Sequence, residues 1–142
     1  GLDRGTTTLI LGPAGSGKTS LGILYAHRAA ERGEKAVIYT FDEGIPTLVE
    51  RATALEMDIR PHIESGAIVV KQIDPAEMTP GEFMWTVKQH VEESGVRTVL
   101  IDSLTGYLDA MPESQFLTIQ MHEMLTYLNQ QGVLSFLTIA QH

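Results

Sequence analysis

The stretch TTTLILGPAGSGKT, residues 6–19, changes character within a few positions. Residues 6–11 are all threonine, leucine or isoleucine, a composition that favours a buried β-strand. A glycine-rich turn follows, and residues 19–31 then place apolar side chains at helical spacing. The order strand, glycine-rich turn, helix predicts a βα unit near the start of the chain.

The turn in this unit matches the pattern G-x-x-x-x-G-K-[S/T], in which glycines let backbone N–H groups point at phosphate oxygens. The helix that follows directs its positive end at the same anion. A lysine adds charge at the β- and γ-phosphates, and a threonine hydroxyl is a ligand for Mg²⁺. We therefore expect ATP or ADP to bind here, with Lys18 also acting in catalysis and Thr19 holding the metal. The expected binding residues are Gly12, Pro13, Ala14, Gly15, Ser16, Gly17, Lys18, Thr19 and Ser20.

An overlapping pattern indicates a different kind of nucleotide site. Residues 15–20 are one glycine short of the dinucleotide fingerprint, because Ser20 stands where its third glycine would be. Asp42 lies at about the distance expected for a ribose contact. A dinucleotide fold has no use for the pair Lys18-Thr19, so the triphosphate interpretation is favoured.

The remainder of the chain alternates between β-rich runs and stretches of helical spacing. A capping signature at Thr79-Pro80-Gly81-Glu82 predicts the start of one helix, on which Phe83 and Trp85 are expected to pack. This order predicts an α/β fold, an open and mostly parallel sheet with helices on both faces. Further strands are expected at 36–41, 67–73, 97–102 and 133–140, and helices at 46–56, 58–64, 80–93 and 112–130.

Polar residues follow three of these strands, at the edge where ligands bind in such sheets. Asp102 ends the fourth strand and is expected to hold Mg²⁺ together with Thr19. Asp42 and Glu43 follow the second strand, and a carboxylate there can deprotonate the attacking water. We favour Glu43 as the base, with Asp42 in support. Gln141 follows the fifth strand and is either a contact to the γ-phosphate or simply a polar strand end.

Composition narrows the class of protein. The chain has 142 residues, 43% of them hydrophobic and 20% charged, which suits one globular domain. It has no cysteine, no long apolar run and no signal-peptide pattern, so we expect a cytoplasmic protein without a membrane span. The formal net charge of −8 disfavours non-specific binding to duplex nucleic acid.

Four segments together resemble the RecA-like ATPases of the KaiC type: GLDRGTTTLILGPAGSGKTSL, YTFDE, TVLIDSLT and FLTIAQH. The resemblance implies a three-layer α/β/α domain with strand order 5-1-4-3-2 that hydrolyses ATP within hexameric rings. It implies that Lys18 and Thr19 bind phosphate and Mg²⁺. It also implies that Asp102 is the carboxylate at the metal and Glu43 the catalytic glutamate. Members of the family act in a circadian clock, in signalling and in recombination, and one phosphorylates itself.

Two departures from the family pattern leave alternatives open. The usual acidic pair is Glu-Glu, whereas this chain has Asp42-Glu43. A complete domain of the family also continues well beyond the fifth strand, with basic residues that reach the neighbouring subunit. We therefore expect residues 1–142 to be one core domain cut at both ends. A DNA-binding module of a recombinase and a protein or small-molecule kinase remain as alternative functions.

Overall fold

The computed structural model describes residues 5–12, 17–41, 43–110 and 115–140, without the side chains of residues 9–12, 18 and 140. Its strands are β1 (Thr7–Gly12), β2 (Lys35–Thr40), β3 (Ile68–Gln72), β4 (Val96–Asp102) and β5 (Leu134–Ala140). Its helices are α1 (Lys18–Glu31), α2 (Ile45–Ala54), α3 (Arg60–Ser65), α4 (Pro80–Ser94), α5 (Thr105–Ala110) and α6 (Gln115–Gln130).

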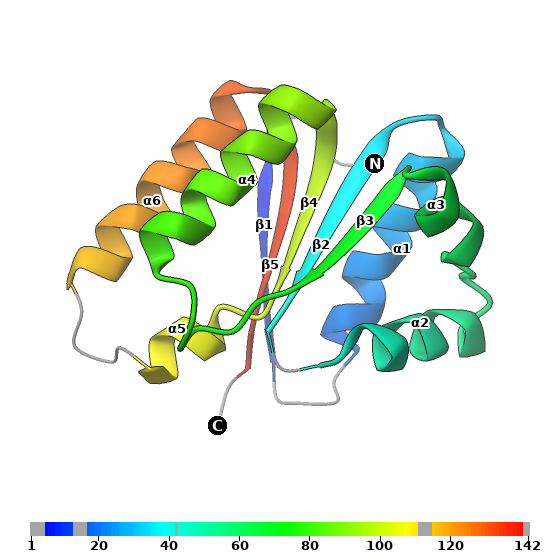
Figure 1. Cartoon of the computed structure of the whole chain (residues 1–142), viewed down its shortest axis with the longest axis horizontal. Coiled ribbons are helices and arrows are strands. Elements are labelled where there is room, and N and C mark those ends of the chain that lie inside the picture. The colour runs from blue at the N-terminus through cyan, green and yellow to red at the C-terminus, as the bar shows by residue number, and fades with distance from the viewer. Residues whose placement is uncertain (1–4, 13–16, 42, 111–114, 141–142) are drawn as a thin grey trace.

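The strands form one parallel sheet between two layers of helices. Helices α1, α2 and α3 cover one face, and α4 and α6 cover the other, with α5 below them (Figure 1). Alternate residues of a strand point to opposite faces, so Ala36 and Ile38 join the core under α1 while Val37 and Tyr39 join the core under α4. The expected three-layer α/β/α fold is confirmed.

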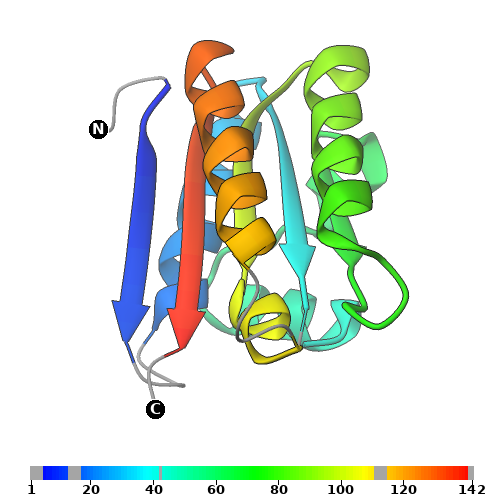
Figure 2. The ribbon, with the colours of Figure 1, turned by 90° about the vertical axis from the view of Figure 1, so that its left-hand side faces the viewer.

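The order of the strands differs from the expected 5-1-4-3-2. The sheet runs β1-β5-β4-β2-β3, so β1 and β3 are its edges (Figure 2). Burial explains the difference, because a strand with a neighbour on each side is covered more completely than an edge strand. Residues 36–40 of β2 and 134–138 of β5 are buried, whereas Lys71 and Gln72 at the end of β3 are exposed.

The helices follow the expected pattern in α1 to α4 and depart from it after β4. The capping box at α4 is formed, because the Glu82 N–H donates to Thr79 Oγ1 at 3.1 Å and the Thr79 N–H donates to Glu82 Oε1 at 3.2 Å. Helix α5 was not expected. It is short and contains Gly106, so its sequence carries little helical signal. The helix expected at 112–130 is observed as α6, and residues 111–114 lie outside the described part.

A cluster of aromatic rings lies beneath the carboxyl edge of the sheet. Phe83 is fully buried, with ring centroids 5.0 Å from Tyr39, 5.4 Å from Phe41 and 5.9 Å from Tyr107. The Tyr107 hydroxyl donates to the Met78 carbonyl at 2.6 Å. The cluster thus joins the end of β2, the start of α4 and α5. The expected packing is confirmed for Phe83 and wrong for Trp85, whose surface is 63% exposed.

Candidate functional site

The first turn of α1 contains the described part of the glycine-rich loop. Gly17 precedes the helix at φ 88°, a left-handed conformation that side chains other than hydrogen rarely adopt. Lys18 begins the helix, and Thr19 and Ser20 follow as half-buried residues. Gly12 is the last residue of β1. The expected binding residues Pro13, Ala14, Gly15 and Ser16 lie outside the described residues, as does the side chain of Lys18.

Three polar side chains from different elements meet at the carboxyl edge of the sheet. The Thr19 hydroxyl donates to Asp102 Oδ2 at 2.8 Å, and the Thr138 hydroxyl donates to Asp102 Oδ1 at 2.6 Å. Thr138 is fully buried on β5 and is paired in register with Asp102 on β4. Both oxygens of the Asp102 carboxylate are therefore oriented, one by α1 and one by the sheet.

The close approach of α1 to β4 accounts for the contact between Thr19 and Asp102. Gly22 lies on the face of α1 that packs on the sheet, and a Cβ atom built there would lie 2.5 Å from Leu100 Cδ1. Leu100 is itself fully buried on β4. Because residue 22 has no side chain, the helix can lie near enough for Thr19 to reach the end of the strand.

Glu43 lies in the turn between β2 and α2, and its side chain is only 15% exposed. The Thr40 hydroxyl donates to the Glu43 carbonyl at 2.8 Å and holds this turn. Arg51 Nη1 on α2 lies 3.2 Å from Glu43 Oε2, whereas Oε1 is buried with no hydrogen-bond partner in the described part of the chain. Burial raises the pKa of Glu43, the charge of Arg51 lowers it, and the charge of Asp102 raises it. The expected residues Asp42 and Gln141 lie outside the described residues.

The donor set at Asp102 fits Mg²⁺. The described residues contain no group of three or more His, Cys, Asp or Glu side chains that could enclose a metal ion. They do bring together one carboxylate and one hydroxyl, both hard oxygen ligands. Mg²⁺ in nucleotide sites takes few protein ligands and completes its shell with phosphate oxygens and water.

Sequence reasoning identified Thr19, Asp102 and Glu43 but missed two residues that orient them. A signal for Thr138 exists, since it is a hydroxyl residue in the otherwise apolar run FLTIA. Arg51 has no local signal, because its partner Glu43 belongs to a different element and comes near only in the folded chain.

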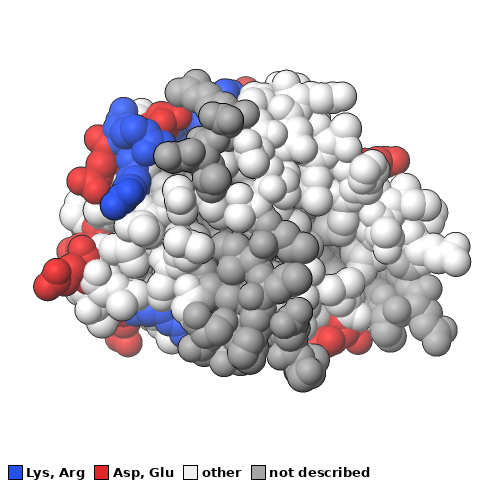
Figure 3. All heavy atoms as spheres, turned by 180° about the vertical axis from the view of Figure 1, so that it is seen from behind, with Lys and Arg blue, Asp and Glu red and all other residues white. Residues whose placement is uncertain are grey.

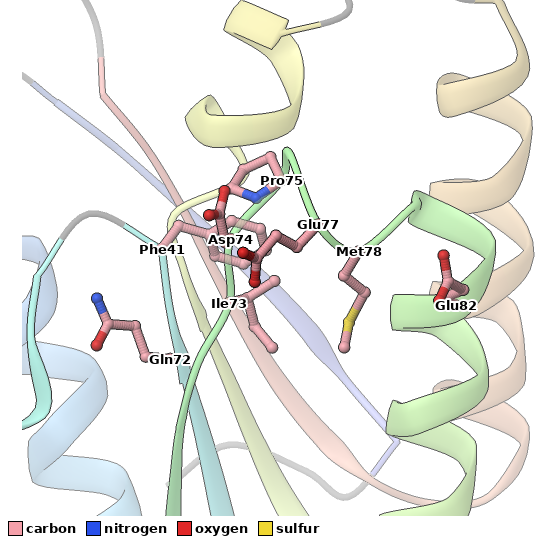
Figure 4. A pocket seen from close by; sticks show the side chains of 8 residues that line it. All are labelled: Phe41, Gln72, Ile73, Asp74, Pro75, Glu77, Met78 and Glu82. Atoms are coloured by element: carbon pink, nitrogen blue, oxygen red, sulfur yellow. The ribbon is translucent and has the colours of Figure 1, made fainter.

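An open hollow of about 610 Å³ lies at the other end of the carboxyl edge, beyond β2 and β3. Its charged lining residues are Asp74, Glu77 and Glu82, which come from the loop after β3 and the first turn of α4 (Figure 4). These carboxylates repel phosphate, and β1, which leads into the glycine-rich loop, is at the opposite edge of the sheet. The hollow is therefore not a site for the nucleotide phosphates.

The charged surface gives no observation in favour of nucleic acid. On the face seen in Figure 3, Lys and Arg side chains gather in small groups beside Asp and Glu, and much of the described surface is uncharged. No basic stripe crosses the part of this face that the structure describes. In the same described residues, no helix is long and apolar enough to cross a membrane.

The parallel sheet, the loop between β1 and α1, and the acidic end of β4 define an α/β domain of the RecA-like P-loop class. A family described as ATPase: KaiC matches residues 1–142. The chain belongs to this family.

Relatives among characterised proteins agree with this assignment. The circadian clock protein KaiC2 of Synechocystis is 24% identical over 147 residues, and the match covers 97% of this chain and 26% of that protein. The circadian clock oscillator protein KaiC of Synechococcus elongatus is 23% identical, with 97% and 28% covered. A tRNA dimethylallyltransferase of Bifidobacterium longum is 33% identical over 101 residues, covering 65% of this chain and 29% of that protein. The chain thus spans under a third of the length of these relatives.

Proposed function

We propose that this chain binds ATP and hydrolyses it in the presence of Mg²⁺, with its phosphates in the loop of residues 12–19. The observation that carries the proposal is the hydrogen bond of 2.8 Å between Thr19 and Asp102. It brings the first turn of α1 and the end of β4 to one place, and Glu43 lies close enough for the Asp102 charge to raise its pKa. Membership of the KaiC ATPase family supports the same reaction.

In the proposed reaction, Glu43 acts as the general base. The oxygen of a water molecule forms a bond to the γ-phosphorus while the bond from that phosphorus to the bridging oxygen breaks. The bridging oxygen keeps the electron pair and leaves as part of ADP, and the water gives its proton to Glu43 Oε1. That oxygen suits the role because it is buried and has no other partner among the described residues. The proton then passes to solvent, which restores the carboxylate.

Asp102 and Thr19 would hold Mg²⁺, with Thr138 orienting the carboxylate. When bound, the ion neutralises charge on the β- and γ-phosphates. Lys18 adds a second positive charge at these oxygens. Because the described residues near Glu43 are themselves partly acidic, such charges are needed to bring a polyphosphate into this site.

The proposal predicts that Lys18→Ala weakens ATP binding at least tenfold, about 1.4 kcal/mol in binding free energy. The physical reason is the loss of a point charge at the phosphates. Calorimetric titration of ATP into the chain measures the effect. Lys35→Ala is the matched control, since Lys35 is an exposed lysine at the start of β2. Equal affinity in the wild type and the Lys18 variant would contradict the phosphate site.

A second prediction concerns the metal. Asp102→Asn is expected to remove most of the gain in ATP affinity that Mg²⁺ provides, because an amide is a poor ligand for this ion. Titrations with Mg²⁺ and with a chelator give the gain for each protein. Asp109→Asn removes an exposed carboxylate on α5 and is expected to keep the full gain. If Asp102→Asn also kept it, Asp102 would be a structural residue.

The wider role that we propose is signalling, timing or regulation within a ring-shaped oligomer, probably of the kind formed by six copies. Two observations support it: the family is that of KaiC, and the printed names of relatives are those of clock proteins. In such a ring, cations from a neighbouring copy would add to Lys18 at the γ-phosphate.

A further inference from the structure

The two oxygens of the Glu43 carboxylate have different surroundings. Oε2 forms an ion pair with Arg51 Nη1 at 3.2 Å, and Oε1 is buried without a hydrogen-bond partner in the described part of the chain. A carboxylate held at one oxygen cannot rotate freely, so the direction of its second oxygen is restricted as well. One contact therefore determines where the free oxygen points.

Arg51 is well placed to impose this restriction. It lies in the last turn of α2, and its neighbours Leu48 and Ala52 on that helix are fully buried. Helix side chains lean toward the N-terminus of the helix, and Glu43 lies just before the N-terminus of α2. The backbone of Arg51 is therefore anchored by packing while its side chain reaches back along α2 to the carboxylate.

We propose that Arg51 is a positioning residue for hydrolysis, which holds Glu43 Oε2 so that Oε1 faces the attacking water. The inference rests on the proposed role of Glu43 as the base. Arg51 does not touch the nucleotide in this proposal, so it acts on the rate of the chemical step and not on the binding of ATP.

The test compares Arg51→Gln, Arg51→Lys and a control, Arg60→Gln. Arg60 forms an equivalent ion pair, with its Nε 2.9 Å from Asp58 Oδ1, but both residues are exposed on a different part of the surface. Turnover number, KM for ATP and thermal unfolding are measured on the whole protein with Mg²⁺ present. Thermal unfolding identifies any variant that loses its fold, and exposed or half-exposed ion pairs contribute little to stability.

We expect Arg51→Gln to lower the turnover number by about 10–100-fold, because loss of orientation at a reacting group has effects of this size. The KM for ATP is expected to stay within about twofold, since the lost contact is not to the nucleotide. Arg51→Lys keeps a charged N–H donor and is expected to restore most of the rate. Arg60→Gln is expected to behave as the wild type.

A double variant separates this inference from the proposed function. In a Glu43→Gln background the base is already absent, so adding Arg51→Gln is expected to cause no further loss of turnover. If Glu43→Gln alone leaves turnover intact, the base assignment fails and this inference fails with it. If Glu43→Gln removes turnover while Arg51→Gln matches Arg60→Gln, the positioning role alone is wrong. A raised KM at unchanged turnover would instead place Arg51 at the nucleotide and overturn the inference.

Discussion

Glu43→Gln is expected to slow ATP turnover by roughly 10²–10⁴ while ATP affinity stays near that of the wild type. Glutamine matches glutamate in size, so the turn held by Thr40 and the burial of the side chain are retained. The amide oxygen, however, cannot take a proton from water at neutral pH. The loss should therefore appear in the chemical step and leave the binding step unchanged.

Steady-state turnover and calorimetric ATP titration on the same preparations give the two quantities. Asp42→Asn is the matched comparison, because it changes the neighbouring carboxylate in the same turn. We expect the Asp42 variant to lose less turnover than the Glu43 variant. If Asp42→Asn caused the large loss and Glu43→Gln did not, the roles of the two residues would be exchanged.

Phe83→Ala is expected to lower the free energy of unfolding by about 3–5 kcal/mol, the usual cost of deleting a buried aromatic ring. Phe83 is fully buried and contacts rings from β2, the following residue Phe41, and α5. Urea unfolding followed by circular dichroism measures the change. Trp85→Ala on the same helix is the control, because its ring is 63% exposed and its loss should change stability by about 0.5 kcal/mol or less.

Two outcomes would contradict this prediction: a loss below about 1 kcal/mol for Phe83→Ala, which is the range of ordinary surface changes, or an equal loss for Trp85→Ala. The cluster also matters for the site, because Phe41 is adjacent to the acidic turn that contains Glu43. A partly collapsed cavity at residue 83 is therefore expected to loosen that turn before the whole domain unfolds.

Local patterns predicted what depends on local chemistry. The βα unit at residues 6–31 and the capping box at Thr79 were predicted because their signals lie within a few consecutive residues. The meeting of Thr19 and Asp102 was predicted from strand direction, since parallel strands bring their carboxyl ends to one edge.

Features that depend on which elements become neighbours were not predicted. The strand order required knowing that β5 lies between β1 and β4, although the exposed Lys71 and Gln72 already pointed to β3 as an edge. Thr138 became visible only after β5 was placed beside Asp102. Arg51 could be linked to Glu43 only once α2 had been folded back along the turn.

The bare Cα of Gly22 has a consequence for which sequences this site tolerates. Gly22 lies in the same helix as Thr19, and its contact residue Leu100 lies in the same strand as Asp102. Any side chain at position 22 would act as a spacer between helix and strand, and it would carry Thr19 away from the carboxylate together with the helix. Substitutions that look harmless in a helix, such as alanine for glycine, would here be read out as a longer distance between two ligands of the same ion. Position 22 therefore acts as a spacing constraint on chemistry that takes place one helical turn away.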